Sequence, residues 1–332
     1  MFEHIYIEDA VAGHPLSRNI LNKFQESTII PCNRYTEIFN RKSQNFRLQK
    51  KNPALILAEK YANFILPAPR GYGIGSGRNY YFSHMLNCIY DCRYCFLQGM
   101  YRSANYVLFV NYEDFERAIH DTIDEHCGGK VNLFSGYDCD SLAFEPVTGF
   151  VEYFLPVIKR YSNALFELRT KSTQIRSLLS LEPLENTVVA YSFTPDEVAR
   201  ALEHKTPAPE KRINAMKNLQ DRGWRLGLRF DPLIYSVNFR EQYQTLFRDI
   251  FNVIEESSIH SVSLGSFRLP RKFFRTMRRL YPEEKLFSSP LEDASGMISY
   301  KKQLHDDMLG YCHDQLLQYI PPEKLFPCEE IP

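Results

Sequence analysis

Short apolar runs alternate with amphipathic segments from about residue 76 onward. The apolar runs predict strands at 106–112, 130–136, 164–172, 187–193, 225–235 and 261–267. The amphipathic segments predict helices at 113–127, 151–162, 209–222 and 240–257, with Gly128 and Gly223 as end caps of two of them. About six such units predict an α/β fold with a parallel sheet, either doubly wound or curled into a full or partial barrel.

The alternation also suggests how the chain is divided. We expect an N-terminal extension at 1–75, a barrel at 76–289 and a C-terminal segment at 290–332. Parallel sheets bind ligands at the carboxyl ends of their strands. Cys139, Lys171 and Ser192 fall at or near the ends of predicted strands, so they are candidate site residues.

Composition narrows the class of protein. The chain has 332 residues, of which 44% are hydrophobic, so it can bury a large core. Forty Lys and Arg balance forty Asp and Glu, and a polyanion site would therefore have to be a local patch. The N-terminus lacks a signal-peptide pattern, and no run of about 18 apolar residues occurs, which predicts a cytoplasmic protein without a membrane partner.

Three of the eight cysteines lie close together in the sequence. Cys88, Cys92 and Cys95 have spacings that let one loop present three thiolates to one metal centre. Iron-sulfur clusters prefer thiolate ligands, usually four, so three would leave one iron free for a small molecule. A zinc site completed by His84, four residues before Cys88, is the alternative.

The Cys-x₃-Cys-x₂-Cys spacing, with Tyr94 between the second and third cysteines, resembles the signature of radical S-adenosylmethionine (SAM) enzymes. The resemblance implies a [4Fe-4S] cluster on the three cysteines, with SAM on the free iron. It also implies a 5′-deoxyadenosyl radical that abstracts hydrogen, an electron donor such as a flavodoxin or ferredoxin, and a partial (β/α)₆ barrel.

The run Tyr94-Cys95-Phe96-Leu97-Gln98 resembles the spore photoproduct lyase family, whose members repair a thymine photoproduct in DNA. Further similar segments are Tyr6-Ile7-Glu8, 106–112, Asp138-Cys139-Asp140-Ser141, Leu168-Arg169-Thr170-Lys171, Tyr191-Ser192-Phe193, Lys211-Arg212-Ile213 with Gly223, and Phe267-Arg268-Leu269-Pro270. The similarity covers roughly residues 4 to 285. We therefore expect a radical SAM lyase that acts on DNA.

By the same resemblance, Cys139 matches the cysteine that gives a hydrogen atom to the product thymine radical, although a buried structural cysteine is the alternative. The family has a tyrosine directly after the third cysteine, thought to relay hydrogen back toward SAM, and this chain has Phe96 there. Phenylalanine has no phenol to donate. Either Tyr94 or another tyrosine substitutes, or the thiyl radical is reduced otherwise, or the substrate differs from the spore lesion.

SAM requires polar partners for its carboxylate, amine and ribose. The resemblance places Ser141, Lys171 and Ser192 at such contacts. An ammonium at a strand end can pair with the methionine carboxylate, so Lys171 has the clearest physical case. Ordinary polar residues are the alternative for each.

A basic run follows the last predicted strand. Its candidate DNA contacts are Arg271, Lys272, Arg275, Arg278 and Arg279, most of which recur at helical spacing and would share one face. An amphipathic helix packed through Phe274 and Met277 is the simpler interpretation. Two other functions also stay open: a radical SAM enzyme acting on RNA or a small metabolite, and a non-catalytic nucleic-acid-binding protein with a structural metal.

Overall fold

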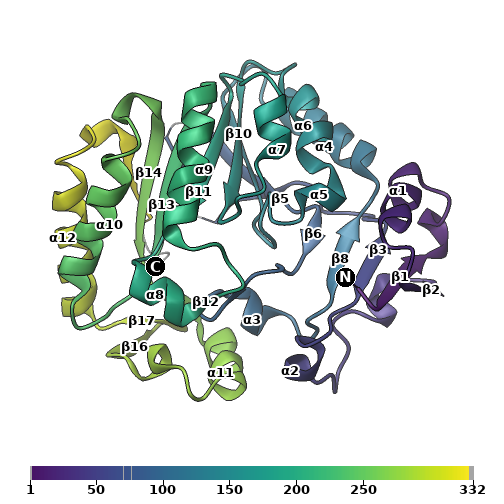
Figure 1. The fold of residues 1–332 in the computed structure, drawn as a ribbon, viewed down its shortest axis with the longest axis horizontal. Helices are drawn as coiled ribbons and strands as arrows, with labels where there is room; N and C mark the ends of the chain where they lie inside the picture. Colours follow the sequence, from purple (N-terminus) through teal and green to yellow (C-terminus); the bar gives the residue numbers. More distant parts are fainter. Residues whose placement is uncertain (1, 70, 76, 329–332) are drawn as a thin grey trace.

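The main sheet contains eight strands in the residues that the computed structural model describes, which are 2–69, 71–75 and 77–328. They are β4 (Leu66–Pro67), β5 (Arg78–Phe82), β9 (Val131–Ser135), β10 (Ala164–Thr170), β11 (Thr187–Ser192), β13 (Arg225–Leu233), β14 (Ile259–Ser266) and β18 (Leu325–Pro327). Their spatial order is β18-β14-β13-β11-β10-β9-β5-β4, and the sheet curls as a half-barrel (Figure 1). All neighbours from β5 to β18 pair in parallel. The predicted partial (β/α)₆ barrel is confirmed.

Helices lie along the outside of the curled sheet (Figure 1). The long ones are α4 (Tyr112–Asp124), α6 (Phe150–Ile158), α9 (Pro209–Arg222), α10 (Phe239–Phe251) and α12 (Lys302–Leu316). In α4 the buried side chains are Tyr112, Phe115, Ile119 and Ile123, the spacing of one helix face. After α9 the chain turns at Gly223 with φ at 97°, a left-handed conformation that glycine adopts without strain.

The N-terminal part, which the sequence predicts as an extension, contributes strands to a second sheet. Its strands are β1 (His4–Glu8), β2 (Thr28–Cys32), β3 (Leu55–Ala58), β6 (Met85–Leu86) and β8 (Tyr106–Phe109), in the order β2-β1-β3-β8-β6. The prediction that 106–112 is the first barrel strand is therefore wrong, because β8 pairs in parallel with β3. An apolar run predicts a buried strand but does not determine its partner. The first parallel strand of the barrel is β5, which is only partly buried.

The C-terminal part joins the barrel at two places. β18 pairs in parallel with β14 and extends the main sheet. β16 (Leu291–Ala294) and β17 (Met297–Tyr300) form a three-stranded sheet with β15 (Arg268–Pro270). Strand pairing thus crosses both predicted boundaries, and the division at 75 and 289 stays a prediction. Across the described ranges, no helix combines the length and apolar character that crossing a membrane requires.

Candidate active site

A cavity of about 600 Å³ opens at the carboxyl ends of the barrel strands. One wall is the loop that carries β7 (Asp91–Cys92) and α3 (Leu97–Met100). Residues at the carboxyl ends of β9, β10 and β11, or directly after them, also line the cavity. The predicted site residues at the cavity are Cys88, Cys92, Cys95, Tyr94, Cys139, Lys171 and Ser192. Residues far apart in the sequence therefore share one cavity, as expected for strand-end positions.

Burial raises the pKa of the Cys88, Cys92 and Cys95 thiols, and the neighbouring thiols raise the pKa of Cys88 and Cys92 further. The Lys171 ammonium acts in the opposite direction on Cys92 and Cys95. Without a bound cationic centre, these thiols therefore stay protonated. No group of three His, Cys, Asp or Glu in the described part of the chain lies close enough to hold one metal ion. A four-iron cluster accommodates wider spacing because each thiolate binds a different iron, so the donor set fits a cluster.

His84 lies outside this cavity. Its ring stacks on Phe150 with centroids 4.0 Å apart, and burial lowers its pKa to about 3. A zinc site would need His84 to complete the three cysteines. Since the ring is packed in the aromatic core and does not line the cavity, the zinc alternative lacks its fourth ligand.

Cys139 follows β9 and is 8% exposed. Burial raises the pKa of its thiol well above the usual value, and the Asp138 and Asp140 carboxylates raise it further. The side chain therefore keeps its S–H hydrogen at neutral pH. A protonated thiol in the cavity wall is the state that hydrogen donation requires, although burial among apolar neighbours from the second sheet equally suits a structural cysteine.

Tyr94 and Phe96 have different environments in the cavity wall. The Tyr94 hydroxyl donates a short hydrogen bond to the buried carboxylate of Glu203, and burial raises the pKa of the phenol. The Phe96 ring lies 5.4 Å from the Tyr137 ring and makes no polar contact. Of the two positions, only Tyr94 offers an O–H hydrogen.

The three residues predicted to contact SAM differ in whether they line the cavity. Lys171 directly follows β10, lines the cavity and places its ammonium 3.6 Å from Glu203. Ser192 ends β11 and also lines the cavity. Ser141 is buried, shares a 2.7 Å hydrogen bond with Ser135 and is not among the lining residues. The structure brings Lys171 and Ser192 to the cavity and leaves Ser141 behind its wall.

Glu203 and Arg212 are a pair that sequence reasoning missed. Glu203 lies in β12 (Glu203–His204), opposite Cys92 of β7 in an antiparallel pairing. Its carboxylate also accepts hydrogen bonds from Thr194 at 3.0 Å and from Arg212. Burial opposes its ionisation, but the nearby cations and hydrogen bonds lower its pKa to about 2. Nothing in the local sequence distinguishes Glu203 from a surface glutamate, because the pairing with Cys92 is a long-range contact.

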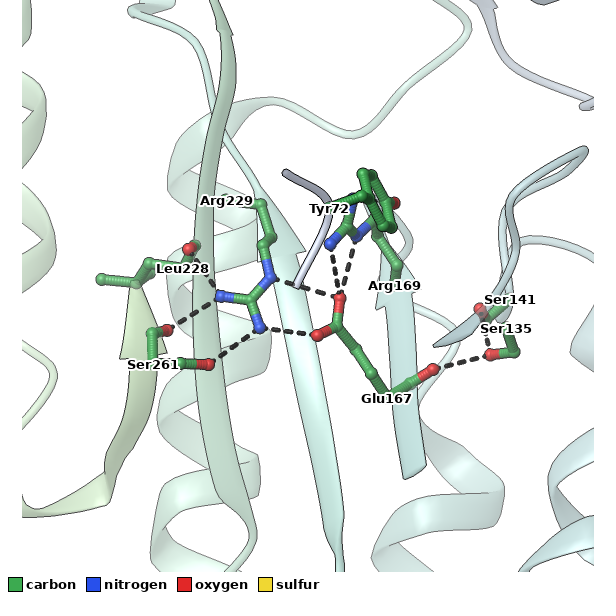
Figure 2. Close-up of polar contacts among 8 residues, drawn as sticks. All are labelled: Tyr72, Ser135, Ser141, Glu167, Arg169, Leu228, Arg229 and Ser261. Carbon is green, nitrogen blue, oxygen red and sulfur yellow. Dashed lines mark hydrogen bonds and ion pairs between the residues drawn. The ribbon is translucent and has the colours of Figure 1, made fainter. Parts of the chain in front are cut away.

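A second buried network lies inside the barrel (Figure 2). Glu167 of β10 accepts hydrogen bonds from Arg229 of β13 at 2.7 and 3.2 Å and from Arg169 at 2.9 Å. Arg169 also donates a hydrogen bond to the Tyr72 hydroxyl, and both residues line the cavity. Burial opposes ionisation of Glu167, while the two arginines lower its pKa to about 2. Ser261 of β14 completes the contacts of Arg229.

The basic run forms α11 (Arg271–Leu280), which packs against α3 beside the cavity. Phe274 and Met277 are buried, as the amphipathic interpretation expected. The exposed residues are Arg271, Lys272, Arg275, Arg278 and Arg279. Arg271 is paired with Asp293, whereas the other four have no ion pair within the described residues.

A partial barrel with three cysteines in a loop across the carboxyl ends of its strands defines the class of radical SAM enzymes. Within that class, the sequence model of the spore photoproduct lyase family matches residues 1–295. The chain therefore belongs to the spore photoproduct lyase family, and the family predicted from the cysteine loop is confirmed.

Individual relatives agree with this assignment. The spore photoproduct lyase of Clostridium acetobutylicum is 21% identical over 317 residues, which cover 92% of this chain and 91% of the relative. That of Bacillus subtilis strain 168 is 23% identical over 297 residues, which cover 85% and 83%. A solved spore photoproduct lyase mutant with bound AdoMet and dinucleoside spore photoproduct has a TM-score of 0.88 at 15% identity, covering 100% of this chain and 99% of that chain. At this identity, the structural likeness shows the fold.

Proposed function

We propose that this chain is a radical SAM lyase that repairs a thymine photoproduct in DNA. One observation carries the proposal: three cluster-type cysteines and a protonated Cys139 thiol face one cavity at the carboxyl ends of the strands. Family membership agrees with it, and so do relatives solved with bound AdoMet and with dinucleoside spore photoproduct.

The chain's own residues have separable roles in this proposal. Cys88, Cys92 and Cys95 would hold a [4Fe-4S] cluster, and Lys171 and Ser192 lie where they can bind the polar groups of SAM. When bound and reduced by an electron donor such as a flavodoxin or ferredoxin, the cluster and SAM supply hydrogen-atom abstraction. Ser141 would act only through Ser135 and the cavity wall, without touching SAM.

Cys139 would complete the repair. Its S–H bond breaks, a C–H bond forms on the product thymine radical, and a thiyl radical stays on the sulfur. Tyr94 can return the hydrogen atom, because its phenol is protonated and lines the same cavity. In that step the Tyr94 O–H bond breaks and the S–H bond of Cys139 forms again, which leaves the radical on the tyrosine.

The test is anaerobic. Iron and sulfide are reconstituted, the protein is reduced with dithionite, SAM and dinucleoside photoproduct are added, and 5′-deoxyadenosine and thymidine products are measured. The unaltered protein should form both 5′-deoxyadenosine and thymidine products, and Cys92→Ala should form neither. Cys139→Ala should still form 5′-deoxyadenosine, but its repair product should be diverted or reduced. Zinc binding without formation of 5′-deoxyadenosine would contradict the enzyme proposal and favour a non-catalytic nucleic-acid-binding protein with a structural metal.

Phe96 favours a second candidate, a radical SAM enzyme with another substrate such as RNA. The phenyl ring removes one hydrogen donor from the cavity wall and leaves an apolar contact with Tyr137. SAM cleavage that RNA stimulates but the dinucleoside photoproduct does not would support this candidate over DNA repair.

A further inference from the structure

A second basic segment lies near the cavity, far from α11 in the sequence. Residues 41–51, called the N-terminal basic segment below, contain five cations and no carboxylate. The segment includes the short helix α2 (Phe46–Gln49). Its exposed cations are Arg41, Lys42, Arg47 and Lys51. In the described part of the chain, no carboxylate forms an ion pair with Arg41, Lys42 or Lys51.

Specific hydrogen bonds hold this segment against the chain that follows α3. The Gln49 side chain accepts a hydrogen bond from the Ala104 amide at 2.9 Å, and Asn40, directly before the segment, accepts one from Arg102 at 2.8 Å. Phe46 and Lys50 line the cavity itself. The Lys50 ammonium is 3.1 Å from the Asp91 carboxylate, so it stabilises the cavity wall and is not free to bind a ligand. The segment is thus a fixed part of the cavity wall.

The segment also meets the chain that follows α11. The Arg47 guanidinium lies 6.0 Å from the centroid of the Tyr281 ring and 3.6 Å from the Glu283 carboxylate. Figure 1 places α2, α3 and α11 along one edge of the molecule. Phe273 of α11 lines the same cavity. Exposed cations of the segment and of α11 therefore lie along one edge of the molecule, next to the cavity.

Leu48 is the unusual residue of this segment. Its side chain is 62% exposed, although it lies on the same short helix as the cavity-lining Phe46. Met100 of α3, which lines the cavity, is 37% exposed, whereas Leu48 is not among the lining residues. An apolar side chain surrounded by cations matches a partner that combines stacked apolar rings with negative charge. A nucleic acid duplex has both, and a lesion inside a duplex must leave the stack to reach a cavity.

We propose that the N-terminal basic segment is the second half of the DNA-binding surface, beside α11. Its exposed cations contact phosphates next to those bound by α11, and Leu48 enters the base stack where the lesion has been extruded. Apolar side chains of DNA-binding proteins insert between base steps in this way and stabilise a partly unstacked, kinked duplex. The inference rests on the proposed function, since it takes lesion-bearing duplex DNA as the substrate.

The charge part of the proposal is tested with matched lysine variants of the reconstituted protein. Lys42→Gln with Lys51→Gln removes two segment cations. Lys130→Gln with Lys159→Gln removes two exposed lysines near the amino ends of β9 and β10, away from the cavity. Duplex binding is measured against salt concentration, and each lost phosphate contact should lower the salt slope by about 0.9. A segment variant with the slope of the control would overturn the proposal.

The wedge part is tested with Leu48→Ala on two substrates. Repair of the lesion in a duplex should fall about tenfold, as expected for loss of a contact worth roughly 1.4 kcal/mol, while repair of the dinucleoside photoproduct should be unchanged. Fluorescence of 2-aminopurine beside the lesion should show less extrusion. Equal effects on both substrates, or none on either, would exclude the wedge. Absence of dinucleoside repair by the unaltered protein would instead refute the proposed function, and the binding measurements would still test the surface.

Discussion

Two buried glutamate–arginine pairs in this chain have similar physics and different surroundings. Glu203 with Arg212 lies beside the cysteine loop, and Glu167 with Arg229 lies inside the barrel. All four side chains are at most 1% exposed. In each pair, nearby cations outweigh the effect of burial and lower the pKa of the carboxyl to about 2.

The two pairs differ in the residues to which they are bonded. Glu203 accepts a hydrogen bond from Tyr94 and lies 3.6 Å from Lys171, and both of these partners line the cavity. Glu167 is also bonded to a cavity-lining residue, Arg169, but Arg169 belongs to strand β10, whereas Tyr94 belongs to the cysteine loop. A perturbed buried carboxyl is therefore not by itself a sign of a functional site. The groups to which it is bonded determine whether it positions the site or only the fold.

The largest expected effect is on stability, and it should be similar for both pairs. Glu203→Gln and Glu167→Gln each leave an arginine buried without its counterion, which should lower the free energy of unfolding by roughly 3–5 kcal/mol. Urea unfolding can be followed by fluorescence of Trp224, the one tryptophan, which is buried. Adding Arg212→Met or Arg229→Met, respectively, should recover most of the loss. A loss below about 1 kcal/mol would contradict burial of these ion pairs.

Acid should weaken both pairs over the same pH range. Each carboxyl has a folded pKa of about 2 and an ordinary value of 4.5, so its contribution to stability is fully present above pH 4.5. The contribution is lost as pH falls toward 2, by roughly 3 kcal/mol for each group. Urea midpoints measured between pH 6 and pH 3 should fall less steeply in either glutamine variant. Parallel curves for variant and unaltered protein would contradict the low pKa.

Catalysis should distinguish the pairs. In folded protein, Glu203→Gln with Arg212→Met should lower SAM-dependent repair of the dinucleoside about 100-fold. Glu167→Gln with Arg229→Met should lower it by no more than about threefold, because only the first network is bonded to the cysteine loop, through Tyr94. The fraction of 5′-deoxyadenosine that leads to repair should fall in the first variant alone. Equal losses of repair activity in both double variants would mean that the two networks contribute equally to positioning the active site.

The smallest effects come from the phenol attached to each network. Tyr94→Phe removes the donor to Glu203, and Tyr72→Phe removes the acceptor of a hydrogen bond from Arg169. Each should lower the free energy of unfolding by about 1–2 kcal/mol. Only Tyr94→Phe should also reduce the number of repair turnovers per SAM consumed, which product and SAM assays measure together. A similar loss of turnovers with Tyr72→Phe would weaken the proposed relay role of Tyr94.

The sequence predicted the barrel well because most of its elements carry local signals. The buried runs of β9, β10, β11, β13 and β14 and the one-sided apolar patterns of the helices extend over enough residues to identify each element. It failed at β8, because a buried run of four residues specifies burial without specifying which sheet it joins. It also gave no indication that the first residues form a second sheet with β8.

The candidate site divides in the same way. The three cysteines, Cys139, Lys171 and Ser192 were recognisable because each belongs to a short motif or a strand end. Ser141 carried the same kind of signal but turns into the wall. The cations of residues 41–51 can be read directly from the sequence, but the position of this segment at the cavity comes only from the structure.

The sequence alone thus determined the elements, the type of fold and the cysteine chemistry, because these depend on residue type and on spacing along a few turns or strands. The tertiary structure decided which carboxylate reaches Tyr94, that His84 packs on Phe150 and does not line the cavity, and that α2 lies along the same edge of the molecule as α11. These contacts join residues up to about 230 positions apart. Packing of whole elements sets such contacts, and no local pattern encodes them.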